Sequence, residues 1–83
     1  MEILYFAWIR EKIGTNSETI LLPDNISKVQ DLLLWLQASS DKHASALKDL
    51  SIIKVAVNQE YAKLDDPISN DDEVALFPPV TGG

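Results

Sequence analysis

Several residue types that build common functional sites are missing from this sequence or scarce in it. Its 83 residues include no cysteine, one histidine and three glycines. Without cysteine the chain has no disulfide framework, no thiolate metal site and no cysteine nucleophile. The single histidine, His43, also excludes metal sites that are built on several histidines. No apolar run approaches the roughly 18 residues of a membrane-spanning helix, so no membrane span is expected.

Positive charge is scarce as well. Seven Lys and Arg stand against 13 Asp and Glu, which gives a formal net charge of −6. Polyanions repel such a chain, so neither a nucleic-acid nor a membrane partner is expected. The start of the sequence lacks the basic segment of a signal peptide, which together with the lack of cysteine favours a cytoplasmic location. The length allows one small domain.

The hydrophobic pattern predicts two strands, a long helix with a shorter one after it, and two further strands. The expected strands cover residues 2–9, 18–22, 52–58 and 73–77, and the expected helices cover 27–39 and 43–50. The first strand is apolar throughout, which is typical of a strand covered on both faces. Residues 9–13 are expected to add a short helical turn. The second helix is expected to place Ala44, Leu47 and Leu50 on one side.

The long helix carries the clearest periodic signal. Apolar residues recur at i, i+3, i+4 and i+7, and they are Val29, Leu32, Leu33 and Leu36. Ser27 and Gln30 fit a capping box at its start. Leu34 and Trp35 lie off the apolar face, so they are expected to be partly exposed or packed under a loop.

The order of these elements favours one mixed sheet of four or five strands with one main helix across one face. The fold class is therefore α+β, of the β-grasp or ubiquitin-like type. Residues 1–77 form the expected domain, and residues 78–83 form a flexible tail that ends in Gly-Gly.

Motifs of self-contained enzymes are absent. The sequence has no Ser-His-Asp signature, no G-x-S-x-G, no P-loop and no G-x-G-x-x-G. His43 lies in a polar stretch and is predicted to be a solvated surface residue. The acidic residues between 65 and 73 do not have the spacing of a calcium loop, so a solvated turn is favoured and no metal site is predicted.

The end of the sequence is the most informative segment. It contains Phe77, Pro78, Pro79, Val80, Thr81, Gly82 and Gly83. The two prolines favour an extended path, and six residues can reach about 20 Å. Glycine has no Cβ, so the last two residues can enter a channel too narrow for other side chains. Many glycine-rich chain ends have no function. Here the two prolines followed by two terminal glycines together favour a functional tail.

A partner surface is predicted on the sheet. If Ile3, Tyr5 and Ala7 face the helix, the alternating residues Leu4, Phe6 and Trp8 lie on the open face. Ala56 and Phe77 project to that same face, and Tyr61 follows the expected turn at residues 58–60. An apolar face on an otherwise acidic chain favours an interface.

The tail FPPVTGG resembles that of the small subunits of molybdopterin synthase, the MoaD-type sulfur carriers. The segments YFAWIREKIG, VAVNQEY and DDEVALFPPVTGG are also similar to that family, so the resemblance covers essentially the whole chain. It implies that Gly83 is adenylated by an E1-like adenylyltransferase and converted to a thiocarboxylate by a sulfur donor. The tail then delivers sulfur to cyclic pyranopterin monophosphate.

The resemblance also implies the partners. The large subunit of molybdopterin synthase would supply the catalytic residues, in a heterotetramer with two copies of each subunit. This chain would be a non-catalytic carrier that binds no cofactor, and the activating enzyme would use the ATP. Phe6, Tyr61 and Phe77 would contact the partner, and the residues from Pro78 to Gly82 would form the delivery arm.

Three alternatives stay open. A thiamine-thiazole sulfur carrier of the ThiS type shares the fold and the Gly-Gly end, although it lacks the F-P-P-V-T segment. A ubiquitin-like protein modifier would be joined to lysines of its targets through Gly83. A β-grasp interaction domain without tail chemistry is the third alternative.

Overall fold

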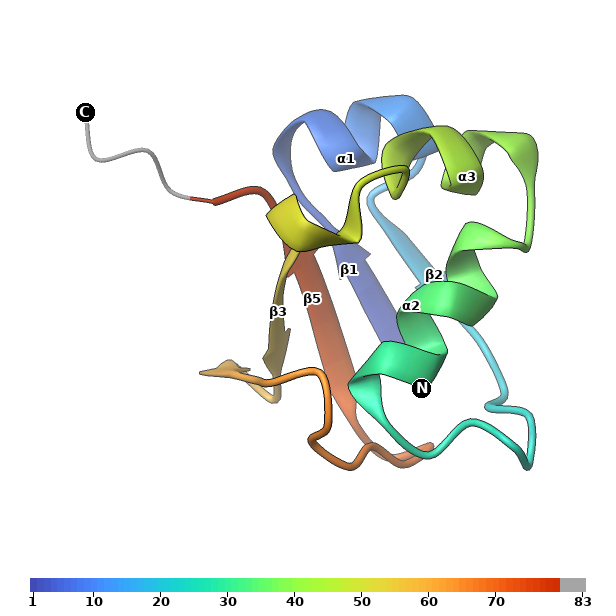
Figure 1. The fold of residues 1–83 in the computed structure, drawn as a ribbon, viewed down its shortest axis with the longest axis vertical. Coiled ribbons are helices and arrows are strands. Elements are labelled where there is room, and N and C mark those ends of the chain that lie inside the picture. Colours follow the sequence, from blue (N-terminus) through green and yellow to red (C-terminus); the bar gives the residue numbers. More distant parts are fainter. Residues whose placement is uncertain (80–83) are drawn as a thin grey trace.

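The computed structural model describes residues 1–79, which form a five-stranded sheet with helices packed on it (Figure 1). The elements are β1 (Glu2–Tyr5), α1 (Ala7–Ile13), β2 (Ser17–Thr19), α2 (Val29–Gln37), α3 (Asp41–Ala46), the 3₁₀ helix η1 (Leu50–Ile52), β3 (Lys54–Val57), β4 (Glu60–Tyr61) and β5 (Glu73–Phe77). The described part of the chain contains no helix that is both long and apolar enough to cross a membrane.

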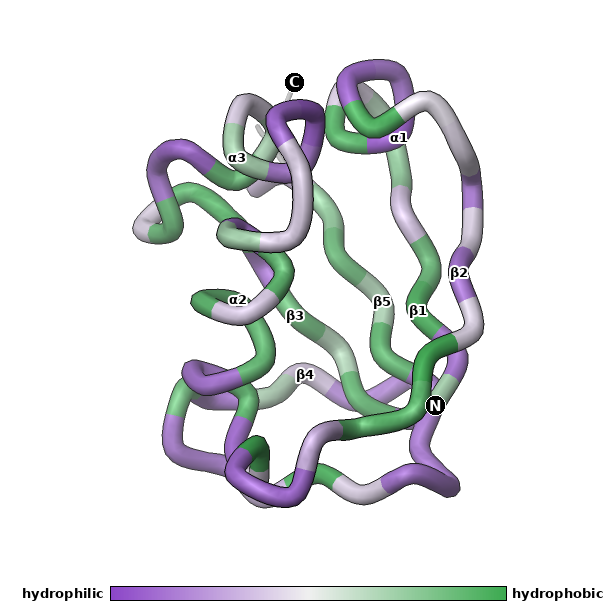
Figure 2. Tube along the Cα trace, turned by 90° about the vertical axis from the view of Figure 1, so that its right-hand side faces the viewer, coloured by the Kyte–Doolittle hydropathy of each residue, from purple (hydrophilic) through white to green (hydrophobic). Residues whose placement is uncertain are grey.

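The sheet has the strand order β2-β1-β5-β3-β4. The central pair, β1 and β5, is parallel, and the other neighbours are antiparallel. Helices α2 and α3 lie on one side of the sheet (Figure 2). This mixed sheet with α2 across one face confirms the predicted β-grasp, ubiquitin-like fold.

Helix α2 supplies much of the core. The predicted apolar residues are all buried, and they are Val29, Leu32, Leu33 and Leu36. Leu34 is 49% exposed, and Trp35 is partly buried against the core, as the pattern predicts. Burial of leucine side chains contributes about 1.5–3 kcal/mol each, so this face holds the helix on the sheet.

The predicted capping box at the start of α2 is wrong. The helix begins at Val29, its N-cap is Lys28, and no side chain caps it. Instead, the N–H groups of Val29 and Gln30 donate to the carbonyl oxygens of Asp66 and Leu64, at 3.0 and 2.9 Å. A loop distant in sequence therefore satisfies the free N–H groups that a local cap otherwise serves.

The predicted strand at residues 2–9 is also wrong in its second half. Strand β1 ends at Tyr5, and α1 begins at Ala7, whose φ of 54° turns the chain. In α1 the i, i+4 pair Ile9 and Ile13 is buried, so a helix satisfies this apolar run as well as a strand does. Ala7 is therefore exposed and does not face α2, and Trp8 is a helix residue rather than part of the open sheet face.

The remaining differences are smaller. Strand β2 is shorter than predicted and ends at Thr19, although the N–H of Ile20 still donates to the carbonyl of Met1 at 2.9 Å. Helix α3 begins two residues earlier than predicted and ends at Ala46 rather than at residue 50, so Leu47 and Leu50 lie beyond it. It buries Ala46 rather than Ala44. Ser40 caps it by accepting from the N–H of His43.

The end of the sheet follows the sequence closely. Asn58 and Gln59 have φ of 51° and 71° and connect β3 to β4, which is the turn predicted there. Strand β5 has the predicted bounds, with Val74 and Leu76 buried and the alternate residues on the other face.

Candidate functional site

The open face of the sheet carries a row of apolar residues that crosses four strands. In register, Leu4 pairs with Ala75, Ala75 with Ala56, and Ala56 with Tyr61. Residues paired in this way point to the same side of a sheet. The two alanines make the middle of the row flat, while Tyr61 at its edge is 80% exposed. The row therefore offers an apolar surface with one projecting aromatic ring.

Phe77 stands at the end of this face where β5 stops. Its ring lies 5.9 Å from that of Tyr61, centroid to centroid, with an angle of 54° between the planes. Aromatic pairs at such distances and angles attract each other beyond simple burial. Phe77 pairs with Lys54 across the sheet and is directly followed by Pro78 and Pro79, of which Pro79 is exposed. The aromatic pair thus marks the base of the predicted tail.

Phe6 reaches the same end of the sheet by a different route. It is the N-cap of α1, and its N–H donates to the carbonyl of Leu76 at 3.1 Å, so its backbone adjoins the end of β5. The Phe6 side chain is 45% exposed. The three residues predicted to contact a partner therefore come from the end of β1, from β4 and from β5. We call Phe6, Tyr61 and Phe77 the docking surface.

Other predicted site residues fall elsewhere. Trp8 packs partly against the core from α1, with Nζ of Lys12 at 5.8 Å from the centroid of its ring. Val80, Thr81, Gly82 and Gly83 lie outside the described residues, so their predicted role as a delivery arm stays a prediction.

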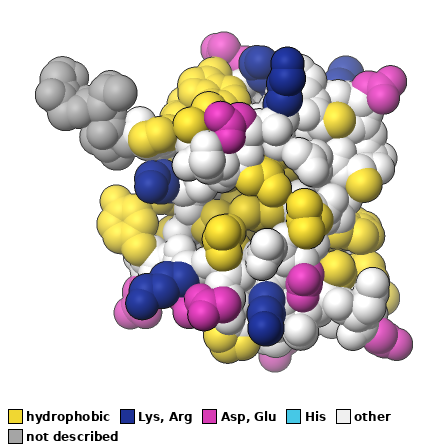
Figure 3. All heavy atoms as spheres, viewed as in Figure 1, with side chains coloured by type: hydrophobic (Ala, Val, Ile, Leu, Met, Phe, Trp, Pro, Cys, Tyr) yellow, Lys and Arg dark blue, Asp and Glu magenta, His cyan; other side chains and the backbone are white. Residues whose placement is uncertain are grey.

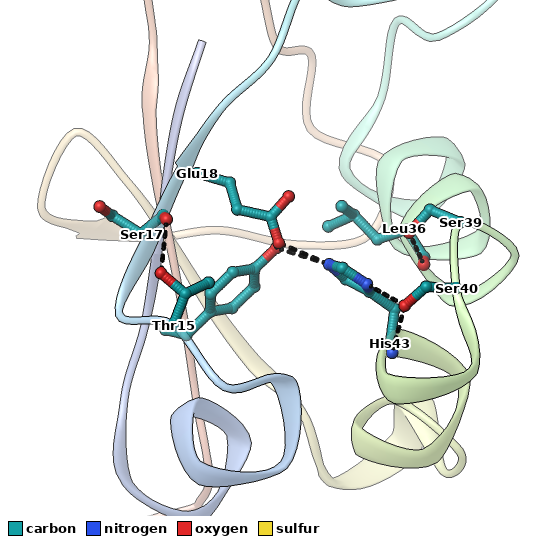
Figure 4. A network of polar contacts seen from close by, with 8 residues as sticks. Thr15, Ser17, Glu18, Leu36, Ser39, Ser40 and His43 are labelled. Atoms are coloured by element: carbon teal, nitrogen blue, oxygen red, sulfur yellow. Dashed lines mark hydrogen bonds and ion pairs between the residues drawn. The ribbon is translucent and has the colours of Figure 1, made fainter.

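The prediction that His43 is a solvated surface residue is wrong. Its side chain is only 12% exposed, and Nε2 lies 2.6 Å from Oε1 of Glu18 (Figure 4). Nδ1 lies 2.6 Å from Oγ of Ser40, and the hydroxyl of Tyr5 donates to Oε1 of Glu18 at 3.2 Å. Burial, the charge of Glu18 and this hydrogen bond together raise the pKa of the Tyr5 phenol well above its ordinary value.

This network joins α3 to the first two strands. The sequence indicated that Tyr5 needs a polar partner, because a buried tyrosine hydroxyl requires one and Tyr5 was expected to face the helix. The identity of that partner depended on α3, which tertiary packing places beside β2. The network lies on the helix side of the sheet, so it supports the fold rather than the docking surface.

The acidic residues after β4 are used within their own loops. Asp72 accepts hydrogen bonds from the N–H of Ser69 and from the side-chain amide of Asn58, both at 2.8 Å. Asp66 accepts from the N–H of Lys63 at 2.9 Å. Within residues 1–79, no group of three or more His, Asp or Glu side chains is placed to hold a metal ion. These carboxylates therefore stabilise turns.

The sequence is similar to that of known proteins. Residues 3–83 match the model of the ThiS family. The chain is 40% identical to the molybdopterin synthase sulfur carrier subunit of Escherichia coli (strain K12), over 83 residues that take in 100% of this chain and 99% of that one. It is 39% identical to the molybdopterin synthase sulfur carrier subunit of Haemophilus influenzae, with the same coverage.

The fold has solved counterparts as well. The crystal structure of the small archaeal modifier protein SAMP1 from Haloferax volcanii superimposes with a TM-score of 0.77. The two chains are 33% identical, and the match covers 100% of this chain and 98% of the other. The sequence and the fold thus point to the same group of small ubiquitin-like proteins.

Proposed function

The chain belongs to the ThiS family of ubiquitin-like proteins, and on that basis we propose that it is the sulfur carrier subunit of a molybdopterin synthase. The observation that carries the proposal is the 40% identity over the full length with a relative of that name. The family match alone leaves the kind of carrier open. The name shared by both bacterial relatives favours molybdopterin synthase over the thiamine-thiazole pathway.

The proposed chemistry takes place at the carboxylate of Gly83. A carboxylate is a poor electrophile at neutral pH because it is ionised, with a pKa near 3.3. An E1-like adenylyltransferase would let this carboxylate attack the α-phosphate of ATP, so that pyrophosphate leaves and an acyl-adenylate forms. A sulfur donor would then displace AMP and leave a thiocarboxylate. The carrier itself binds no cofactor in this scheme, because the ATP belongs to the activating enzyme.

Delivery of the sulfur would take place in the large subunit. The tail would carry the thiocarboxylate to cyclic pyranopterin monophosphate, and two such transfers would form the dithiolene of molybdopterin. The docking surface supports this scheme, because exposed aromatic rings stand at the base of the tail and a partner bound there would receive its tip. We further propose a heterotetramer with two copies of each subunit, in the cytoplasm, where ATP is available.

A reconstituted assay tests the proposal. Purified carrier in thiocarboxylate form is added to the large subunit and precursor, and the molybdopterin formed per carrier is measured. Deletion of Gly83 should abolish product, because it shifts the reacting carbon by about 3.3 Å and errors of 1 Å can already cost ~100-fold. The melting temperature should stay unchanged, since β5 ends at Phe77, before the deleted residue. Normal product from the deletion variant would refute the carrier function.

A protein modifier is the second candidate, because SAMP1 shares the fold at 33% identity. Mass analysis of the C-terminal peptide from cells distinguishes the two functions. Exchange of one oxygen for sulfur at Gly83 supports a carrier, whereas an isopeptide branch to a target lysine supports a modifier. An unmodified terminus under all growth conditions would contradict both.

A further inference from the structure

Basic residues are concentrated around η1, close to the docking surface. One hollow of about 400 Å³ between α1 and η1 is lined by Lys12 and Lys48 and by one acidic residue, Asp49. A second hollow of about 370 Å³, on the other side of η1, is lined by Lys54 and Lys63. These four make up more than half of the seven basic residues of a chain with net charge −6. The charged residues that line the two hollows are these four lysines and Asp49, so the local charge has the opposite sign to that of the whole molecule.

The second hollow is continuous with the docking surface. Tyr61 is one of its lining residues, and Lys54 pairs in register with Phe77. Leu64, which is 50% exposed, completes its apolar lining. On the face shown in Figure 3, hydrophobic side chains lie with basic and acidic ones near the point where the described chain ends. No acidic residue lines this hollow.

None of these lysines forms an ion pair within the described residues, although Oδ2 of Asp66 accepts from the N–H of Lys63 at 2.9 Å and so lies close to that residue. Within residues 1–79 the one close contact of a basic with an acidic side chain joins His43 to Glu18, at 2.6 Å. Lys54 and Lys63 are both exposed. Their ammonium groups therefore lie beside an apolar surface without an ion-pair partner in that part of the chain.

Acidic residues stand on the opposite side of Tyr61. A third hollow, of about 450 Å³, is lined there by Glu60, Asp66 and Asp72 together with Tyr61 itself. The surface charge thus changes sign across one exposed ring. An arrangement of this kind favours one orientation of a bound partner, because the reversed orientation brings like charges together.

We propose that the hollow lined by Lys54 and Lys63 receives carboxylate groups of the protein that binds the docking surface. The inference rests on the proposed function, since it describes the surface chemistry of that partner. The partner presents an apolar contact for Tyr61 and Phe77, with acidic side chains on the side of the tail. Charges at the rim of an interface act mainly on the rate of association. Lys54 and Lys63 therefore steer the end of the sheet where β5 stops toward the acidic groups of the partner.

Charge reversal tests the inference. Association of the intact carrier with the purified large subunit is followed by stopped-flow fluorescence at 20 to 500 mM NaCl. The double variant K54E/K63E should slow association about 10-fold or more at low salt, within the range of electrostatic steering. The difference from wild type should shrink as salt rises, because salt screens exposed charges.

The control is K28E/K42E, which makes the same change in net charge at two exposed lysines, the N-cap of α2 and a residue of α3, that line none of these hollows. It should associate within about twofold of wild type. Equal slowing by the two double variants would overturn the inference, because the effect would then come from net charge. Wild-type rates for K54E/K63E would overturn it as well.

Two further comparisons keep the outcomes distinct. Circular dichroism melting shows whether K54E/K63E is folded. If it is not, the neutral variant K54Q/K63Q is measured instead. It removes the charge without reversing it, so a smaller slowing of association is expected. If wild type binds and the lysine variants bind equally well, only the charge inference fails. If wild type does not bind the large subunit at all, the proposed function fails and the inference falls with it.

Discussion

His43 Nε2 and Glu18 Oε1 lie 2.6 Å apart and connect helix α3 to strand β2. A carboxylate oxygen accepts hydrogen bonds, so it is an N–H at Nε2 that His43 presents to it. The same oxygen accepts from the hydroxyl of Tyr5, which is 1% exposed. Glu18 therefore accepts hydrogen bonds from the buried Tyr5 and from the partly buried His43. The planes of these two rings meet at 71°.

Tyr5→Phe should make the protein less sensitive to alkali. The fold raises the pKa of the Tyr5 phenol, by burial first and then through Glu18. Below pH about 10 both the folded and the unfolded chain keep this proton, so stability does not depend on it. Above that pH the unfolded chain releases the proton while the folded chain retains it, so the free energy of unfolding falls.

One proton accounts for about 1.4 kcal/mol per pH unit at most. Urea unfolding of both proteins at pH 8, 10, 11 and 12 measures the effect, and Tyr61→Phe is the control because Tyr61 is 80% exposed. The curve for Tyr5→Phe should be flatter above pH 10 than those of wild type and control. Parallel curves would show that Tyr5 does not retain its proton in the folded state.

Leu33→Ala should destabilise the domain strongly, whereas its neighbour Leu34→Ala should not. Leu33 is fully buried and Leu34 is 49% exposed on the same helix. Truncation of a buried leucine removes apolar contacts and leaves a cavity, which costs about 2–5 kcal/mol. The exposed site should change the free energy of unfolding by less than about 0.5 kcal/mol. Chemical denaturation of both variants checks the contrast, and similar losses at both sites would contradict the assignment of the buried face.

Gln59→Gly should stabilise the hairpin between β3 and β4. Gln59 has a φ of 71°, in the left-handed region where residues with a Cβ are disfavoured. With Asn58 before it, the variant has the Asn-Gly pair that two-residue hairpin turns favour. Relief of the left-handed strain, about 1–2 kcal/mol, exceeds the extra backbone entropy that glycine loses, about 0.5–1 kcal/mol, so we expect a gain of about 0.5–1 kcal/mol in the free energy of unfolding. Gln59→Ala keeps the Cβ and is the matched control. A gain of equal size in that control would mean that relief of backbone strain is not the cause.

Phe77→Ala should weaken binding to the large subunit without unfolding the protein. Its ring contacts Tyr61 on the open face, away from the core under α2. Truncating an aromatic anchor in an interface typically costs at least ~1–2 kcal/mol of binding. Titration calorimetry measures the affinity, and Leu21→Ala is the control because Leu21 is an 82% exposed apolar residue outside the docking surface. Unchanged affinity of Phe77→Ala for both the large subunit and the activating enzyme would remove Phe77 from the interface.

The sequence by itself determined the elements whose apolar pattern has one solution. The i, i+3, i+4, i+7 spacing in α2 permits one buried helix face, and the alternation in β5 permits one buried strand face. Together with the order of the other predicted strands, these two elements indicated the β-grasp arrangement. The resemblance of the tail to sulfur carriers also needed no structure, because it lies in the residue types and in their order.

Tertiary structure decided the features that depend on residues far apart along the chain. The apolar pattern predicted a strand through residues 7–9, whereas the packing of Ile9 and Ile13 against the core places them in α1. The free N–H groups of α2 found carbonyl partners in the loop at Leu64 and Asp66, which no local signal shows. His43 became a partner of Glu18 only because α3 folds beside β2. Patterns along the chain report periodic burial, whereas polar pairing across the fold depends on distances that exist only after folding.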